Sequence, residues 1–158
     1  MLIVSYVVLG SITTAADTVS AAQKDITLQN EARLNTAITI SGVSWTGQVD
    51  GTHDYLHFHI TNNGSEIISN FNATDVYVAI SGDAPVKYTF DAASSPGGHG
   101  NFGSRTWAYD SISTENINPG MLDPGEVMYI YIYDFSNVHP NYMVGATTSK
   151  GASAFFTA

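Results

Sequence analysis

The order of apolar and polar residues divides the chain into two parts that meet near Leu34. The first part opens on residues 1–9, a run that is apolar on every side. Apolar or small residues then recur at gaps of three, four, three and seven. Gaps of three and four place side chains along one face of an α-helix. The pattern therefore predicts one helix over residues 1–34, with an apolar seam that needs a partner helix.

We expect helices from several copies of the chain to bury this seam against one another. At about 1.5 Å per residue the helix is roughly 50 Å long, longer than any globular body that the remaining residues can form. Its N-terminal half should project from the domain. The residues expected to form the assembly helix are Leu2, Ile3, Val4, Tyr6, Val7, Val8, Leu9, Ile12, Ala16, Val19 and Ile26.

Three other interpretations of this helix are weaker. A secretory signal peptide carries basic residues before its apolar stretch, and here the apolar run begins at Met1 with no Lys or Arg before it. A transmembrane helix needs about 20 apolar residues, and this run stops at Gly10 and Ser11. A helix packed on its own sheet would leave part of residues 1–9 uncovered, because that run is apolar on every side.

After residue 35 the apolar period changes from that of a helix to the alternation of β-strands. Leu56, Phe58 and Ile60 alternate with Tyr55, His57, His59 and Thr61, so one side of this strand faces a core. Short segments of this kind, bounded by turn residues, are typical of an antiparallel sandwich. The predicted fold class is α+β: a long helix over 1–34 and an immunoglobulin-like β-sandwich over 35–158. The expected strands are 36–45, 54–61, 66–70, 75–80, 86–91, 105–110, 126–134, 141–147 and 153–157.

Charge and composition narrow the class of function. Five Lys and Arg against 14 Asp and Glu give a net charge of −9, which argues against binding of nucleic acid. The chain has no cysteine, and only 12% of its residues are charged, against about 25% in typical proteins. The resulting neutral, hydroxyl-rich surface is typical of a folded extracellular β protein.

The sequence offers little that could carry catalysis. His57 and His59 share one strand face and His53 could join them, at a spacing that a metal site would use. The same spacing suits a structural or interface face, which we favour. The usual nucleophile, phosphate-loop and dinucleotide motifs are missing from the sequence. We therefore expect no enzyme activity, no catalytic or metal site and no cofactor.

Two asparagines lie in sites for N-linked glycosylation. These are Asn63, in Asn-Gly-Ser, and Asn72, in Asn-Ala-Thr. Both fall in turn-like segments beside predicted strands, where a glycan could reach solvent.

Several segments together resemble the archaeal flagellins. Residues 5–10 (SYVVLG), followed by a helix rich in Thr, Ala and Gln, are similar to the N-terminal core helix of that family. Residues 62–65 (NNGS) and 107–109 (WAY), and then 118–126 (NPGMLDPGE), look similar as well. The resemblance follows most of the chain in order.

This resemblance implies a structural subunit of an archaellum, the archaeal flagellar filament used for motility and adhesion. The N-terminal helices would bundle into the filament core, and the immunoglobulin-like domains would form an extracellular sheath with glycosylated asparagines. The implied partners are further copies of the chain and the basal machinery of the archaellum.

In two respects the chain departs from that family. Its members carry a short class III signal peptide with basic residues, and an apolar stretch about twice as long as residues 1–9. Met1 is then an internal residue of the precursor, or the helix is abbreviated. The alternatives are an archaellum stator protein and an adhesive pilin-type surface module whose sandwich binds the cell wall.

Overall fold

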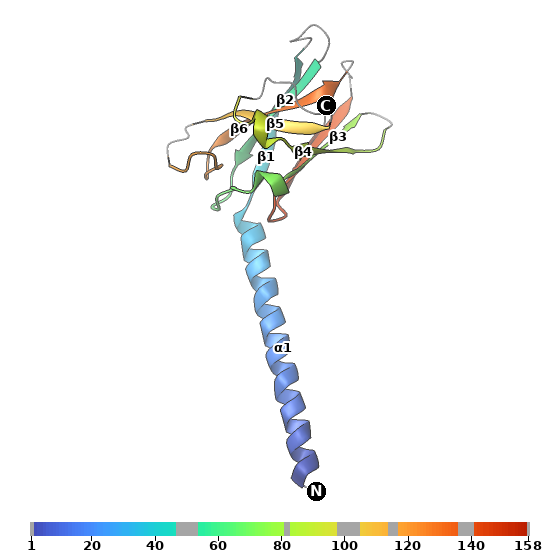
Figure 1. The fold of residues 1–158 in the computed structure, drawn as a ribbon, viewed down its shortest axis with the longest axis vertical. Helices are drawn as coiled ribbons and strands as arrows, with labels where there is room; N and C mark the ends of the chain where they lie inside the picture. The colour runs from blue at the N-terminus through green and yellow to red at the C-terminus, as the bar shows by residue number, and fades with distance from the viewer. Residues whose placement is uncertain are drawn as a thin grey trace.

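A single helix, α1 (Leu2–Asn35), stands out from a β-sandwich (Figure 1). The computed structural model describes residues 2–46, 54–80, 83–97, 105–113, 117–135 and 141–157. Proline is missing from the first 34 residues and Gly10 is their one glycine, so little interrupts the helical hydrogen bonds. The predicted helix is confirmed and ends at Asn35, one residue later than expected.

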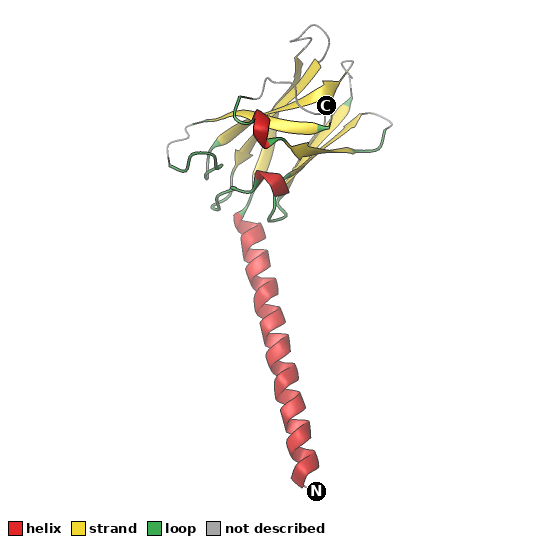
Figure 2. Cartoon of the chain, viewed as in Figure 1, coloured by secondary structure: helices red, strands yellow, loops and turns green. Residues whose placement is uncertain are grey.

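Among the described residues, eight strands form the sandwich (Figure 2). Two short 3-10 helices, η1 (Phe71–Ala73) and η2 (Ala92–Ser94), lie between them. The predicted strands are confirmed apart from 66–70. Their bounds are β1 (Ile38–Thr46), β2 (Asp54–Asn62), β3 (Asp75–Ile80), β4 (Val86–Phe90), β5 (Thr106–Ile112), β6 (Val127–Phe135), β7 (Tyr142–Thr147) and β8 (Ser153–Thr157).

The strands follow the order β1-β2-β6-β5-β4-β3-β7-β8. The two end strands, β1 and β8, contact each other, so the sheet curls toward a closed barrel. Neighbouring strands are antiparallel except β4 and β5, which pair in parallel through Thr89 with Thr106 and Phe90 with Trp107. The predicted antiparallel sandwich is confirmed, with this parallel pair as an exception. The Phe90 and Trp107 rings pack there with centroids 4.7 Å apart.

The alternation seen in the sequence fills the core. Leu56 and Phe58 of β2, and Ile130 and Ile132 of β6, are fully buried, as is Trp107 of β5. Each such side chain contributes about 1.5–3 kcal/mol when it leaves water. This core lies within the sandwich and holds β2, β5 and β6 together.

The segment 66–70 does not form the predicted strand. It makes one isolated antiparallel bridge, from Ile68 to Leu122. Asn70 turns the chain away from the sheet because its side chain accepts a hydrogen bond from the backbone N–H of Ala73, at the start of η1. A cap of this kind competes with strand pairing.

Tyr55 differs from its neighbours on the outward side of β2. Only 3% of Tyr55 is exposed, whereas His57 and His59 are half-buried. It packs with Ala108 of β5 and Tyr131 of β6 in a small cluster outside the main core. The short side chain of Ala108 leaves room for the Tyr55 ring.

Candidate assembly interface

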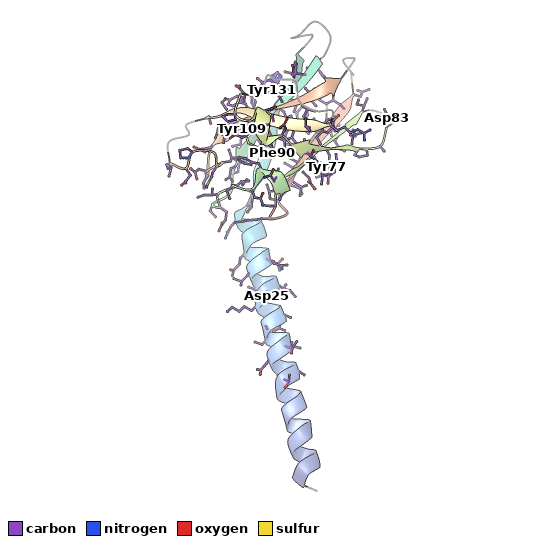
Figure 3. The ribbon with its side chains drawn as sticks, viewed as in Figure 1. Asp25, Tyr77, Asp83, Phe90, Tyr109 and Tyr131 are labelled. Carbon is purple, nitrogen blue, oxygen red and sulfur yellow. The ribbon has the colours of Figure 1, made fainter. Side chains whose placement is uncertain are left out.

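The described surface of α1 lies in solvent. Every residue from 14 to 31 is exposed, and Val19, Ile26 and Leu28 are exposed by 57%, 58% and 52%. Figure 3 shows the side chains of this stretch, including Asp25, extending sideways from the helix and clear of the sandwich. A single copy of the chain therefore leaves large apolar side chains of α1 uncovered.

The predicted assembly residues all lie on this helix. Ala16, Val19 and Ile26 are among its exposed residues. The backbone of the others is helical, but their side chains lie outside the described part of the structure: Leu2, Ile3, Val4, Tyr6, Val7, Val8, Leu9 and Ile12. Leu28 is exposed as well, but it does not fall on the predicted seam. It lies two residues from Ile26 and is turned about 160° away around the helix.

Backbone hydrogen bonds hold the end of α1 to the segment after β2. The carbonyl oxygen of Asn35 accepts from the N–H groups of Ser65 (2.8 Å) and Glu66 (3.2 Å). The carbonyl oxygen of Ala37 accepts from those of Asn63 (2.8 Å) and Gly64 (3.0 Å). The two bonds to Asn35 satisfy a carbonyl group that the helix end leaves without a partner. They fix the point where the helix enters the sandwich.

The buried side chain of Asn62 forms hydrogen bonds with backbone groups at this junction. Its side chain is fully buried. The side-chain amide N–H groups donate to the carbonyl oxygens of Glu66 (2.8 Å) and Leu122 (2.9 Å). The amide oxygen accepts from the N–H of Gly64 (3.0 Å). Asn62 thus connects the segment that holds α1 to the loop before β6.

Two of the segments quoted for the family resemblance meet at Asn62. The N–H of Gly125 donates to the Asn62 carbonyl (2.7 Å), and the Asn62 N–H donates to the Glu126 carbonyl (3.0 Å). Within the second segment, a carboxylate oxygen of Glu126 accepts from the N–H of Asp123 (2.9 Å), and Asp123 accepts from the Asn118 side chain (2.8 Å). Sequence reasoning singled out both segments without revealing that they contact each other.

His57 and His59 lie on the outer side of β2 in a row of aromatic rings. The His57 ring stacks on Tyr131, with centroids 5.9 Å apart, and the His59 ring meets Tyr129 edge-on at 4.5 Å. The hydroxyl of Ser44 lies 3.0–3.1 Å from ring nitrogens of His57. Burial, and then the nearby His59, lower the pKa of His57 below its ordinary value. These contacts favour the structural or interface interpretation of this face.

The described residues do not favour a metal site near His57 and His59. Within them, no three His, Cys, Asp or Glu side chains are grouped so that they could hold a metal ion. His53 lies outside the described residues.

Both sequon asparagines are accessible. Asn63 is exposed, and its side-chain amide donates to the hydroxyl of Thr39 (3.0 Å). Asn72 is exposed in the middle of η1. Either side chain could carry a glycan without entering the core.

The described part of the chain contains no helix with the length and apolar character that a bilayer crossing requires.

Comparisons with known proteins give one matching family model and several similar structures. A family model described as archaeal-type flagellin matches residues 1–158. No curated protein matches the chain. Among solved structures, the archaeal flagellum of Methanospirillum hungatei strain JF1 is similar over 99% of this chain and 87% of its own, with 14% identity and a TM-score of 0.57.

Two further structures share the fold. The flagellin FlaB1 of Methanocaldococcus jannaschii covers 77% of this chain and 88% of its own, with 14% identity and a TM-score of 0.54. The archaellum periplasmic stator protein FlaG of Sulfolobus acidocaldarius covers 78% of this chain and 99% of its own, with 22% identity and a TM-score of 0.53.

Proposed function

Because this chain belongs to the archaeal-type flagellin family, we propose that it is a structural subunit of an archaeal flagellar filament and polymerises through α1. One observation carries the proposal: a long helix leaves the sandwich at one end and exposes apolar side chains along its described length. A helix of this kind is stable in water when other helices cover it.

Burial drives the assembly. The apolar side chains of residues 2–12 and those at Ala16, Val19 and Ile26 would face helices of other copies. For seven large side chains, Leu2, Ile3, Val4, Val7, Val8, Leu9 and Ile12, sequestration amounts to about 10 kcal/mol before the cost of ordering. A head-to-tail contact that does not close then gives a helical filament rather than a ring.

Charge sets the conditions for this assembly. Each copy carries a net charge of −9, so the sandwiches repel one another at low salt. At an ionic strength of about 0.15 M the screening length falls to about 8 Å. Polymerisation should therefore become more favourable as salt is added.

The sandwich would form the outer layer of the filament, outside the cell. Its exposed Asn63 and Asn72 would carry N-linked glycans, and the base of the filament would bind the archaellum basal machinery. Only 12% of the residues of the chain are charged, and its surface is rich in hydroxyl groups. Both features support an extracellular setting.

The second candidate function is that of an archaellum stator protein or another surface module. The likeness of the sandwich to FlaG over 78% of this chain favours it. Such a protein would bind a cell-wall polymer through its sandwich and would not form filaments. The flagellum likeness over 99% of the chain, which extends to α1, supports the filament proposal more strongly.

Removal of residues 1–12 tests the proposal. The full chain should form fibres visible in electron micrographs, whereas the shortened chain should elute from a sizing column as a monomer with the circular dichroism of a folded sandwich. A shortened chain that still polymerises would contradict assembly through the helix. A full chain that stays monomeric in high salt and binds a cell-wall polymer would favour the surface module.

A further inference from the structure

Residues 63 and 64 form the only Asn-Gly pair in the sequence. At such a pair the backbone nitrogen of the glycine can attack the side-chain carbonyl carbon of the asparagine, because glycine has no side chain to hinder the approach. The side-chain amide is then lost as ammonia, a reaction called deamidation. Here the pair lies in the segment that binds the end of α1, with Asn63 exposed to water and Gly64 half-buried.

Hydrogen bonds hold both residues of this pair in the folded chain. The N–H of Gly64 donates to the carbonyl oxygen of Ala37 and to the side-chain oxygen of Asn62, each at 3.0 Å. The backbone N–H of Asn63 donates to the same Ala37 carbonyl (2.8 Å), and its side-chain amide donates to the Thr39 hydroxyl (3.0 Å). The attacking nitrogen and the amide that must leave are therefore both held at the junction between α1 and the sandwich.

Deamidation would remove three of these hydrogen bonds. A bond forms between the Gly64 nitrogen and Cγ of Asn63, the Cγ–Nδ2 bond breaks, and the proton of the Gly64 nitrogen leaves with Nδ2 as ammonia. Water then opens the cyclic imide at either carbonyl carbon, which gives aspartate or isoaspartate without any oxidation or reduction. The imide nitrogen has no hydrogen to donate to Ala37 or Asn62, and the departed Nδ2 no longer binds Thr39.

We propose that Asn63 is a deamidation site that the closed junction protects, so that the reaction takes place in copies whose junction has opened. In the closed state Gly64 also lies against the backbone of residues 35–37. The pair cannot form the ring without leaving these contacts. Segments of a folded protein open locally while the rest stays folded, so the reaction requires no unfolding of the sandwich. It requires no partner chain either, and is independent of the proposed filament function.

The isoaspartate product would make the opening permanent. In this product the main chain runs through the side chain of residue 63 and is longer by one carbon. The backbone at Gly64 already lies too close to the end of the helix for a longer segment to fit in the same place. The product also adds a negative charge to a chain that carries −9. A modified copy would therefore hold α1 less firmly than an unmodified one.

Mass spectrometry of the full-length chain, made in a host that adds no N-linked glycan, tests this inference. Folded chain and chain in concentrated urea are incubated at the same mildly alkaline pH, and deamidation of each asparagine is followed with time. In urea we expect Asn63 to react faster than Asn72, which precedes an alanine. In the folded chain Asn63 should react at least tenfold more slowly than in urea.

Two results of this experiment would overturn the inference. An Asn63 that reacts no faster than Asn72 in urea would not be a preferred site. Equal rates at Asn63 in folded and unfolded chain would show that the junction gives no protection.

Two variants distinguish opening of the junction from unfolding of the whole sandwich. Thr39→Val removes the hydroxyl that binds the Asn63 amide and keeps a β-branched residue in β1, so deamidation of the folded chain should rise about threefold or more. Ile130→Val weakens the buried core in β6 and should leave the rate at Asn63 unchanged. A rate that rises in Ile130→Val, or does not change in Thr39→Val, would contradict protection by the junction.

The purified isoaspartate form tests the consequence for α1. It should unfold at a lower urea concentration than the unmodified chain, because its longer main chain cannot restore the contacts with Asn35 and Ala37. Equal urea midpoints would show that the modified segment still fits the junction, and would overturn the permanent opening.

Discussion

A side chain on Gly64 would collide with the carbonyl oxygen of Asn35, the last residue of α1. The same added atom would lie 2.6 Å from the backbone nitrogen of Ala37 and 2.9 Å from the Cα of Thr36. All three neighbours are backbone atoms and cannot move aside as a flexible side chain could. The backbone at residue 64 therefore lies so close to the end of the helix that only glycine fits at this position.

Gly64→Ala should destabilise the junction. The expected loss is about 1–3 kcal/mol in the free energy of unfolding, because the methyl group must displace backbone. Urea unfolding followed by tryptophan fluorescence measures it. Ser65→Ala is the matched control, since it keeps the backbone N–H that binds Asn35 and should change stability by less than about 0.5 kcal/mol. Equal stability of the two variants would contradict the close contact.

Asn62→Ala should cost more than the same change at the neighbouring position. It removes three hydrogen bonds of a buried side chain, each worth about 1 kcal/mol, so we expect a loss of about 3 kcal/mol. Asn63→Ala removes one exposed bond, to Thr39, and should cost less than about 1 kcal/mol. Thermal unfolding of both variants tests this difference. A smaller effect at Asn62 than at Asn63 would show that the buried amide does not hold the junction.

Ile26→Asp should weaken polymerisation and leave the sandwich folded. A carboxylate on the proposed seam must lose its water when helices pack, so we expect the critical concentration for assembly to rise at least tenfold. Ala21→Asp is the control, because at 3.6 residues per turn it is turned about 140° from Ile26. Sedimentation of filaments measures both. If the control blocks assembly as strongly, the predicted seam faces the wrong way.

Stability should fall as the pH drops below about 7. The pKa of His57 is lowered in the folded chain by burial and by His59, so near the ordinary value of about 6.5 the unfolded chain binds more protons. The stability that His57 contributes is present above that value and is lost as the pH falls toward the folded-state pKa. His57→Gln should flatten the dependence of the urea midpoint between about pH 7.5 and about pH 5.5. If the urea midpoint of this variant changes with pH as steeply as that of the unmodified chain, His57 is not the source of the pH dependence.

The elements of this fold could be predicted because their patterns are local. Residues 54–61 alternate without interruption, and β2 (Asp54–Asn62) follows them closely. The segment 66–70 misled the prediction, since Ile67 and Ile68 suggest a strand while the capping side chain of Asn70 ends it. The parallel pairing of β4 with β5 depends on strands brought together by the whole sandwich, which no local pattern records.

The candidate interface was predicted unevenly for a similar reason. The helix spacing predicts Val19 and Ile26 as assembly residues, because a seam repeats at a fixed interval, and the structure shows both side chains exposed. The junction depends on contacts between Asn62 and Leu122, 60 residues apart, which a single sequence does not reveal. In the sequence, Asn63 and Gly64 suggested a glycosylation site and a family resemblance, but no junction with the helix.

The four backbone hydrogen bonds at Asn35 and Ala37 have a mechanical consequence. All four join the last turn of the helix and the start of β1 to one short segment, residues 63–66. A torque or pull applied along the helix is therefore shared among bonds that must break together, and it passes into the sandwich without an intervening flexible linker. The helix of a subunit therefore cannot turn without its own sandwich.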